Sequence, residues 1–291
     1  MDQDKMIDRD NLRNKMDAEV KRVSELFRFI MKYQRHFQPS GVEFSGLRQY
    51  LPSDDASRID WKNSAGKPDL FVKQYEEDVD MDVFIILDAS DTMLFGTGDK
   101  LKSEYAAIVS AALVYASVDA GIDAGFAMYG GDGVFITPKG GNDQYQRVLD
   151  EVTDFDNYGG TFDLEEAMND VIGQIKENTA VFVISDLIDV NGDFKSKMTL
   201  ASHKFRHVMT IMTRDLRDYK LPKSGNIRLG SPTGDGQMVV YTDKLKKKFD
   251  EAAEKQEKEV EDEIEAGGSA FLKIDTRKKF ATAFAEYFDD N

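Results

Sequence analysis

From Met81 onward, short apolar runs alternate with segments of helical periodicity, and this alternation constrains the fold more than any other feature of the chain. The runs "VFIIL" and "AVFVIS" are apolar along nearly their whole length. Such an order predicts an α/β fold with a doubly wound, mostly parallel sheet covered by helices on both faces. We expect strands at residues 83–87, 124–129, 134–137, 180–185, 207–212 and 270–274.

One strand of this sheet is expected to be antiparallel. The segment "GGDG" at residues 130–133 is so short that the strands on either side should form a hairpin, which places an antiparallel strand at the sheet edge. Between the first two strands, apolar residues spaced four and three apart predict a crossover helix. Its stripe consists of Leu101, Tyr105, Ile108, Ala112 and Tyr115.

The pattern divides the chain into residues 1–79 and 80–291. The first part is predicted to hold an amphipathic helix at about residues 8–37, which either packs on its own domain or binds a partner. A small β region with many turn residues follows, and its only tryptophan, Trp61, is expected to be a core residue. The second part is the α/β domain, with a hairpin insertion near residues 225–242.

Composition restricts the class of protein. The 291 residues are 41% hydrophobic and 32% charged, which is typical of a globular protein. A formal charge of −16 argues against general binding to nucleic acid or to an anionic membrane. Cysteine is absent, which excludes disulfides and thiolate chemistry. The first residues do not resemble a secretory signal and no run is long enough to span a membrane, so we expect a cytoplasmic protein.

Carboxylates and hydroxyls gather at predicted strand ends. Asp88 closes the first strand and is followed by Ser90 and Thr92, while Asp186 follows the strand "AVFVIS". Thr161 lies in the glycine-containing loop "YGGTFD" before a helix. In an open α/β sheet, ligands bind beyond the carboxyl ends of the strands. A sparse set of oxygen ligands suits Mg²⁺ better than zinc, so these residues predict a site for Mg²⁺, or for Mn²⁺ or Ca²⁺.

Other chemistries find little support in the sequence. The three histidines have no convincing zinc spacing, since His203 and His207 are four apart but no third ligand stands near them. The chain has no phosphate-binding loop of the G-x-x-x-x-G-K-[ST] type. Ser90 also lacks the G-x-S-x-G elbow of a serine hydrolase.

The five predicted ligands resemble a known motif. Asp88, Ser90 and Thr92, followed by Thr161 and Asp186, are similar to the metal-ion-dependent adhesion site of von Willebrand factor A domains. That motif usually has serine where this chain has Thr92, which keeps the hydroxyl and adds a methyl group. The resemblance implies that the three hydroxyls ligate the ion and that the two aspartates supply charge. It also implies an open coordination position for a carboxylate of a partner protein.

A second resemblance covers more of the chain. Residues 46–65, "GLRQYLPSDDASRIDWKNSA", are similar to the signature R-x-Y-x-P-G-D-D-x-R-R-I-D-W-x-x-S-A of the domain-of-unknown-function fifty-eight family. Ser53 replaces the usual glycine, and Ser57 stands where the first of two arginines is common. The segments "LDASDTM", "ISDLID" and "SPTGDG" also resemble segments of that family. The resemblance implies a MoxR-type AAA+ ATPase as partner, in chaperone-like maturation or metal insertion.

Three functions remain open at this stage. The first is a non-enzymatic, Mg²⁺-dependent interaction module that works with the ATPase and binds a client carboxylate. The second is a phosphoryl-transfer enzyme of the haloacid-dehalogenase kind, although that family has an aspartate where this chain has Ser90. The third is a scaffold with a vestigial metal site.

Arg48, Arg58 and Asp60 could form a structural ion-paired cluster or a partner contact.

Overall fold

The computed structural model describes residues 11–24, 43–50, 60–64, 70–76, 81–188, 194–222, 225–230, 237–280, 283–284 and 287. The chain divides into two compact units. The larger unit is Met1–Met31 together with Met81–Asn291, and the smaller unit is Lys32–Asp80.

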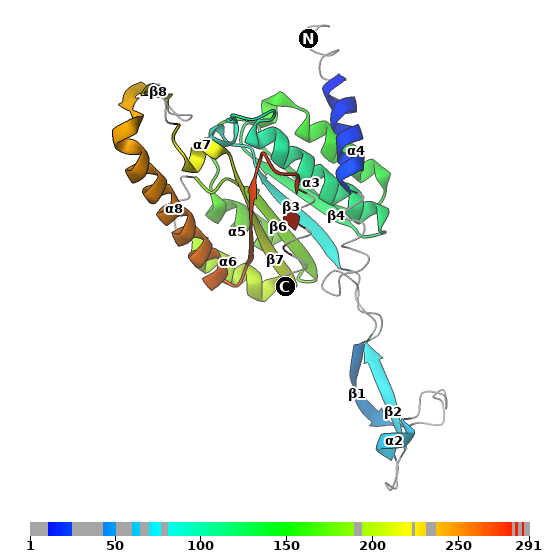
Figure 1. The fold of residues 1–291 in the computed structure, drawn as a ribbon. Coiled ribbons are helices and arrows are strands. Elements are labelled where there is room, and N and C mark those ends of the chain that lie inside the picture. The colour runs from blue at the N-terminus through cyan, green and yellow to red at the C-terminus, as the bar shows by residue number, and fades with distance from the viewer. Residues whose placement is uncertain are drawn as a thin grey trace. The chain divides into compact units, whose positions relative to one another are not determined.

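The larger unit is built on a six-stranded sheet with the order β10-β7-β6-β3-β4-β5 (Figure 1). Four neighbouring pairs are parallel, and β4 with β5 is the antiparallel pair at the edge. The predicted α/β fold, with its mostly parallel sheet and antiparallel edge strand, is therefore confirmed. The strands are β3 (Asp82–Asp88), β4 (Ala124–Tyr129), β5 (Val134–Lys139), β6 (Thr179–Ser185), β7 (His207–Arg214) and β10 (Ala270–Asp275).

Helices cover both faces of this sheet (Figure 1). On one face α3 packs on β3, β4 and α4, and on the other α5 packs on α6, which in turn packs on α8. Every residue of β3 and β6 is buried, which explains why these two strands are apolar runs without alternation. The helices are α3 (Lys102–Asp119), α4 (Asn142–Val152), α5 (Leu164–Gln174), α6 (Phe194–Lys204), α7 (Leu216–Tyr219) and α8 (Thr242–Ala266), with 3-10 turns η2 (Asp91–Met93) and η3 (Phe155–Asn157).

The strand order places a topological switch point between β3 and β6. From β3 the chain crosses through α3 to β4 on one side, whereas β6 pairs with β3 on the other side. Loops that leave the carboxyl ends of β3 and β6 therefore diverge toward opposite faces of the sheet. The resulting crevice is where open α/β sheets bind their ligands.

The N-terminal helix at residues 11–24 belongs to the larger unit. Its buried apolar residues are Met16 and Val20, and Asp17 accepts a hydrogen bond from the Tyr145 hydroxyl of α4 at 2.8 Å. Arg13 also pairs with Asp150 at 2.5 Å. This division differs from the predicted grouping of the helix with the small β region, because proximity in the sequence does not determine which surface an apolar stripe covers. The rest of the predicted helix lies outside the described residues.

The smaller unit contains β1 (Glu43–Gln49) and β2 (Phe71–Glu76), which pair antiparallel, and the short helix α2 (Trp61–Ser64). Trp61 is 65% exposed, so the prediction of a core tryptophan is wrong. Asp60, Ser64 and Val72 are buried here, and the Asp60 carboxylate accepts a hydrogen bond from the Lys62 backbone N–H at 3.1 Å. Arg58, Ser53 and Ser57 lie outside the described residues.

The predicted second hairpin consists of β8 (Asn226–Gly230) and β9 (Gln237–Tyr241), which pair antiparallel and lead into α8. Within the described part of the chain, none of the helices has the length and apolar character needed to cross a membrane.

Candidate metal centre

The switch point brings two buried carboxylates together. Asp88 is the last residue of β3, and Asp186 directly follows the last residue of β6. Because β3 and β6 pair in parallel, their carboxyl ends meet at the same edge of the sheet. Asp88 and Asp186 are 1% and 0% exposed, and Ser90 and Thr92 are also buried.

Asp88 is held by hydrogen bonds to both of its carboxylate oxygens. The Ser90 backbone N–H donates to Oδ1 at 2.9 Å, and the Ser185 hydroxyl donates to Oδ2 at 2.6 Å. Burial raises the pKa of Asp88 to about 6, and the nearby charge of Asp186 adds to this rise. Asp88 therefore fixes the turn that presents the Ser90 side chain and carries a charge that burial disfavours.

Three oxygens next to Asp88 have the spacing of metal ligands. Ser90 Oγ lies 3.0 Å from Thr92 Oγ1, which lies 3.3 Å from Asp186 Oδ1. Mg²⁺ binds oxygens at about 2.1 Å in an octahedron, so neighbouring ligands are about 3 Å apart. These separations also suit hydrogen bonds, so the three groups can bond to one another without an ion. The residues present thus fit Mg²⁺ in ligand type and in spacing.

Thr161 is placed differently from the other four predicted ligands. Its loop is joined to the Asp88 loop by backbone hydrogen bonds, from Gly159 N to Ala89 O at 2.8 Å and from Asp91 N to Gly160 O at 3.0 Å. Gly159 and Gly160 have φ values of 105° and 72°, which explains the glycine pair. Thr161 itself is exposed, and within the described residues none of the hydrogen bonds connects its side chain to the other four.

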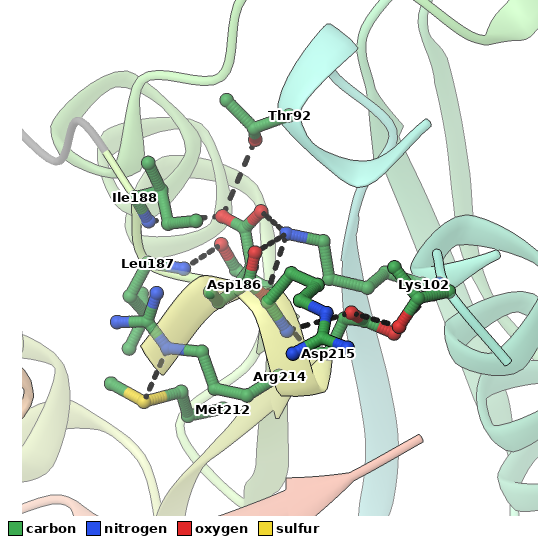
Figure 2. Close-up of polar contacts among 12 residues, drawn as sticks. Thr92, Lys102, Asp186, Leu187, Ile188, Met212, Arg214 and Asp215 are labelled. Atoms are coloured by element: carbon green, nitrogen blue, oxygen red, sulfur yellow. Dashed lines mark hydrogen bonds and ion pairs between the residues drawn. The ribbon is translucent and has the colours of Figure 1, made fainter. Parts of the chain in front are cut away.

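Sequence reasoning missed Lys102, the first residue of α3. Its side chain is 1% exposed, and its Nζ lies 2.7 Å from Asp186 Oδ2 (Figure 2). The same Nζ lies 3.0 Å from Asp218 Oδ2 of α7. Lys102 follows the apolar stripe residue Leu101, and a lysine beside such a stripe usually reaches water. The spacing of the sequence contained no signal that this lysine is instead paired with two carboxylates.

Further polar contacts extend this network to α7 and α8. Asp215 caps α7 by accepting from Arg217 N at 2.9 Å, and its oxygens also bind the Thr97 N–H and hydroxyl. Burial alone would raise the pKa of Asp215, but these hydrogen bonds lower it below its usual value. Arg214 donates to Gln256 of α8 at 2.8 Å, and Gln256 donates to the Leu187 carbonyl beside Asp186 at 3.2 Å.

The charges of this region do not cancel. We use the name buried polar cluster for six side chains: the carboxylates of Asp88, Asp186, Asp215 and Asp218 and the cations Lys102 and Arg214, with no more than 7% of any of them exposed. Four negative and two positive groups leave a formal charge of −2. Burial also raises the pKa of Asp218, although Lys102 opposes this rise. A divalent cation would balance the cluster, and this is a second respect in which the residues fit Mg²⁺.

Comparison with known proteins identifies the family. Residues 46–259 match the family described as "Protein of unknown function DUF58". The chain belongs to this family. The family indicated by the motif at residues 46–65 is thereby confirmed.

Individual relatives of this DUF58 chain are more distant. The uncharacterized proteins Mb1516 of Mycobacterium bovis and Rv1480 of Mycobacterium tuberculosis H37Rv are each 26% identical to it over 193 residues, which are 65% of this chain. The DUF58 chain spans 60% of the length of these relatives.

Among solved structures, the conserved hypothetical protein BatB from Bacteroides thetaiotaomicron is similar over 72% of this chain and 100% of its own, with 15% identity and a TM-score of 0.44. An aerotolerance-related membrane protein from Bacteroides fragilis gives 13% identity, the same coverage and a TM-score of 0.45.

The donor set of this DUF58 chain restricts what the centre could bind. No group of three or more histidine, aspartate or glutamate side chains within the described residues is arranged to hold a metal. The candidate centre instead combines two hydroxyls with the carboxylate of Asp186, beside the charge of Asp88. A hard cation that keeps several waters suits such a set, whereas zinc does not.

Proposed function

We propose that this chain is a non-enzymatic protein-interaction module that binds Mg²⁺, or Mn²⁺ or Ca²⁺, through Ser90, Thr92, Thr161 and Asp186 beside Asp88. The observation that carries the proposal is the set of Ser90, Thr92 and Asp186 oxygens with spacings of 3.0 and 3.3 Å, which adjoins the buried polar cluster of formal charge −2. Three neutral hydroxyls and few carboxylates would leave a bound ion electrophilic. Such an ion can accept one more carboxylate, supplied by a client protein.

The surroundings of the centre support binding to a protein. Leu94 and Phe95, which directly follow η2, are 42% and 38% exposed, and Phe155 of η3 is 66% exposed. The loop after η3 is hydrogen bonded to the Asp88 loop through Gly159 and Ala89. Exposed apolar side chains close to a polar anchor are typical of protein-binding surfaces.

The proposed partner is a MoxR-type AAA+ ATPase, with which the chain would act in chaperone-like maturation or assembly. Membership of the DUF58 family supports this partner, because the family resemblance implies it. The similarity of the Asp88, Ser90, Thr92, Thr161 and Asp186 pattern to the von Willebrand factor A adhesion site supports the mode of binding. We also propose a cytoplasmic location, where such an ATPase would be found.

The test is a binding measurement between this chain and a MoxR-type ATPase from the same genome. We expect the complex to form in millimolar Mg²⁺, to be lost in excess EDTA, and to be lost in Thr92→Ala. Thr199→Ala is the matched control, because Thr199 lies on α6 and its hydroxyl bonds to Lys195 O. An equally stable complex with and without EDTA would refute the proposal.

A phosphoryl-transfer enzyme is the alternative. The nucleophile of such an enzyme must reach its substrate, whereas Asp88 is 1% exposed and accepts hydrogen bonds on both oxygens. This geometry favours a structural role for Asp88. Hydrolysis of p-nitrophenyl phosphate that is lost in Asp88→Asn would support the enzyme instead.

A further inference from the structure

We propose that Lys102 is an internal counter-cation of the candidate metal centre, which holds Asp186 without an ion and weakens the binding of Mg²⁺. This inference rests on the proposed function, because it concerns the same site. It adds a positioning residue that neither the sequence motif nor the predicted ligand set contains.

The geometry gives the two oxygens of Asp186 different partners. Oδ2 accepts from Lys102 Nζ at 2.7 Å, whereas Oδ1 lies 3.3 Å from Thr92 Oγ1 and accepts from Ile188 N at 2.9 Å (Figure 2). Lys102 therefore turns the carboxylate so that Oδ1 faces the hydroxyls. An ion at the hydroxyls would meet one oxygen of Asp186 and not both.

Lys102 is fixed in this place on several sides. Asp218 Oδ2 lies 3.0 Å from the ammonium group, and the ring centroid of Phe95 lies 5.8 Å from Nζ. The backbone N–H of Lys102 donates to Phe95 O at 2.8 Å, which anchors the start of α3 to the same loop. A buried lysine with two carboxylate partners and an aromatic face beside it has little freedom to withdraw into water.

The same position makes Lys102 a competitor of a divalent ion. The ammonium group and the ion would share Asp186, and two cations close together in a buried site repel each other strongly. Lys102 also supplies part of the charge that Asp186 would otherwise need from the ion. We therefore expect a centre that is stable without an ion and binds Mg²⁺ weakly. A client carboxylate that also coordinates the ion would then increase the affinity of the centre for Mg²⁺.

The test compares Mg²⁺ affinity between two substitutions that remove the same charge from the full chain. Lys102→Met keeps a long unbranched side chain without the ammonium group, and we expect it to tighten Mg²⁺ binding by about tenfold or more over the wild type. Lys100→Met is the matched control, since Lys100 lies two residues away and pairs with Glu19 at 3.0 Å. Its affinity should stay within about twofold of the wild type.

Lys102→Met could fail to fold without an ion because it leaves Asp186 and Asp218 without their cationic partner. The double variant Lys102→Met/Asp218→Asn reduces this cost, because it removes one charge of each sign and keeps the formal charge of the buried polar cluster. It too should bind Mg²⁺ more tightly than the wild type. Isothermal titration calorimetry with MgCl₂ gives the affinities, and the rise of the melting temperature with Mg²⁺ gives an independent readout.

The outcomes separate this inference from the proposed function. Wild-type binding with tighter binding in the Lys102 variants supports both. Wild-type binding with unchanged or weaker binding in both Lys102 variants overturns the inference and leaves the proposed function standing. Binding by the variants without wild-type binding up to about 10 mM supports the inference and overturns the proposed function. Absence of binding in all of them overturns both.

Discussion

The charge of Asp88 should make the metal-free protein less stable as the pH rises. The pKa of Asp88 rises from 3.8 to about 6, chiefly because the carboxyl is buried and secondly because Asp186 is close. The folded state therefore holds a proton that the unfolded state has lost between about pH 4 and pH 6. Since protons favour the folded state in that window, raising the pH through it lowers the free energy of unfolding, by about 3 kcal/mol for a shift of this size.

Asp88→Asn removes this dependence, and the comparison between the two proteins isolates it. We expect urea unfolding in EDTA to show that the wild type loses about 3 kcal/mol relative to Asp88→Asn between pH 4 and pH 7.5. The substitution also changes the hydrogen bond with Ser185. That change would shift the free energy of unfolding of Asp88→Asn by the same amount at every pH, so the two proteins would still differ in how this free energy depends on pH. Asp132→Asn is the matched control, because it makes the same substitution at an exposed carboxylate.

Magnesium should act mainly on the wild type. An ion that binds the folded state raises stability by mass action, and the charge of Asp88 is part of what attracts it. Adding millimolar Mg²⁺ at pH 7.5 should therefore restore much of the lost stability in the wild type and little in Asp88→Asn. Parallel stability curves for the two proteins from pH 4 to pH 7.5 in EDTA would refute the reasoning, because they would mean that Asp88 has the same pKa folded and unfolded.

Three further predictions concern the stability of residues outside the candidate metal centre. Val20→Ala should cost about 2 kcal/mol in the unfolding of the larger unit, since the side chain is 0% exposed, and an unchanged urea midpoint would show that the helix at residues 11–24 does not pack there. Gly131→Ala should lower the melting temperature clearly, because its Cβ would lie 2.1 Å from Asp156 O; a melting curve like that of the wild type would contradict this close approach. Asp275 has a pKa lowered to about 2, because hydrogen bonds from Arg277 and Tyr219 outweigh the effect of burial. Asp275→Asn should therefore cost at most about 2 kcal/mol at pH 7, and this cost should shrink as the pH falls from about 4 to about 2, as measured by urea unfolding across that range.

The sequence was most informative for the buried strands, because burial on both faces requires an apolar run that is visible in the sequence. The apolar runs of β3 and β6 cannot be exposed, so they predicted the parallel sheet, and the residues that end them predicted which loops converge. The hairpin of β4 and β5 followed from a connection too short for a crossover. For Asp88 and Asp186, polar residues at strand ends were enough to predict that they would meet.

The misses have a shared physical origin. The place of Lys102 depends on a partner 84 residues away in sequence, and local spacing carries no information about such a pair. The helix at residues 11–24 has a stripe that could cover either unit, and the choice depends on contacts such as that between Asp17 and Tyr145. Trp61 was expected inside because it is large and apolar, but a two-stranded unit with a short helix offers little interior for such a side chain.

Within the described residues, the hydrogen bonds that attach the Thr161 loop to the Asp88 loop join peptide groups, from Gly159 N to Ala89 O and from Asp91 N to Gly160 O. Peptide groups are the same in every residue type except proline, so this attachment survives most substitutions in either loop. We therefore expect that the exposed Phe155 of η3 can be substituted without moving the polar centre, whereas Phe162 packs against the hydrophobic core. A polar centre and an exposed surface that are joined in this way can therefore vary in sequence independently of each other.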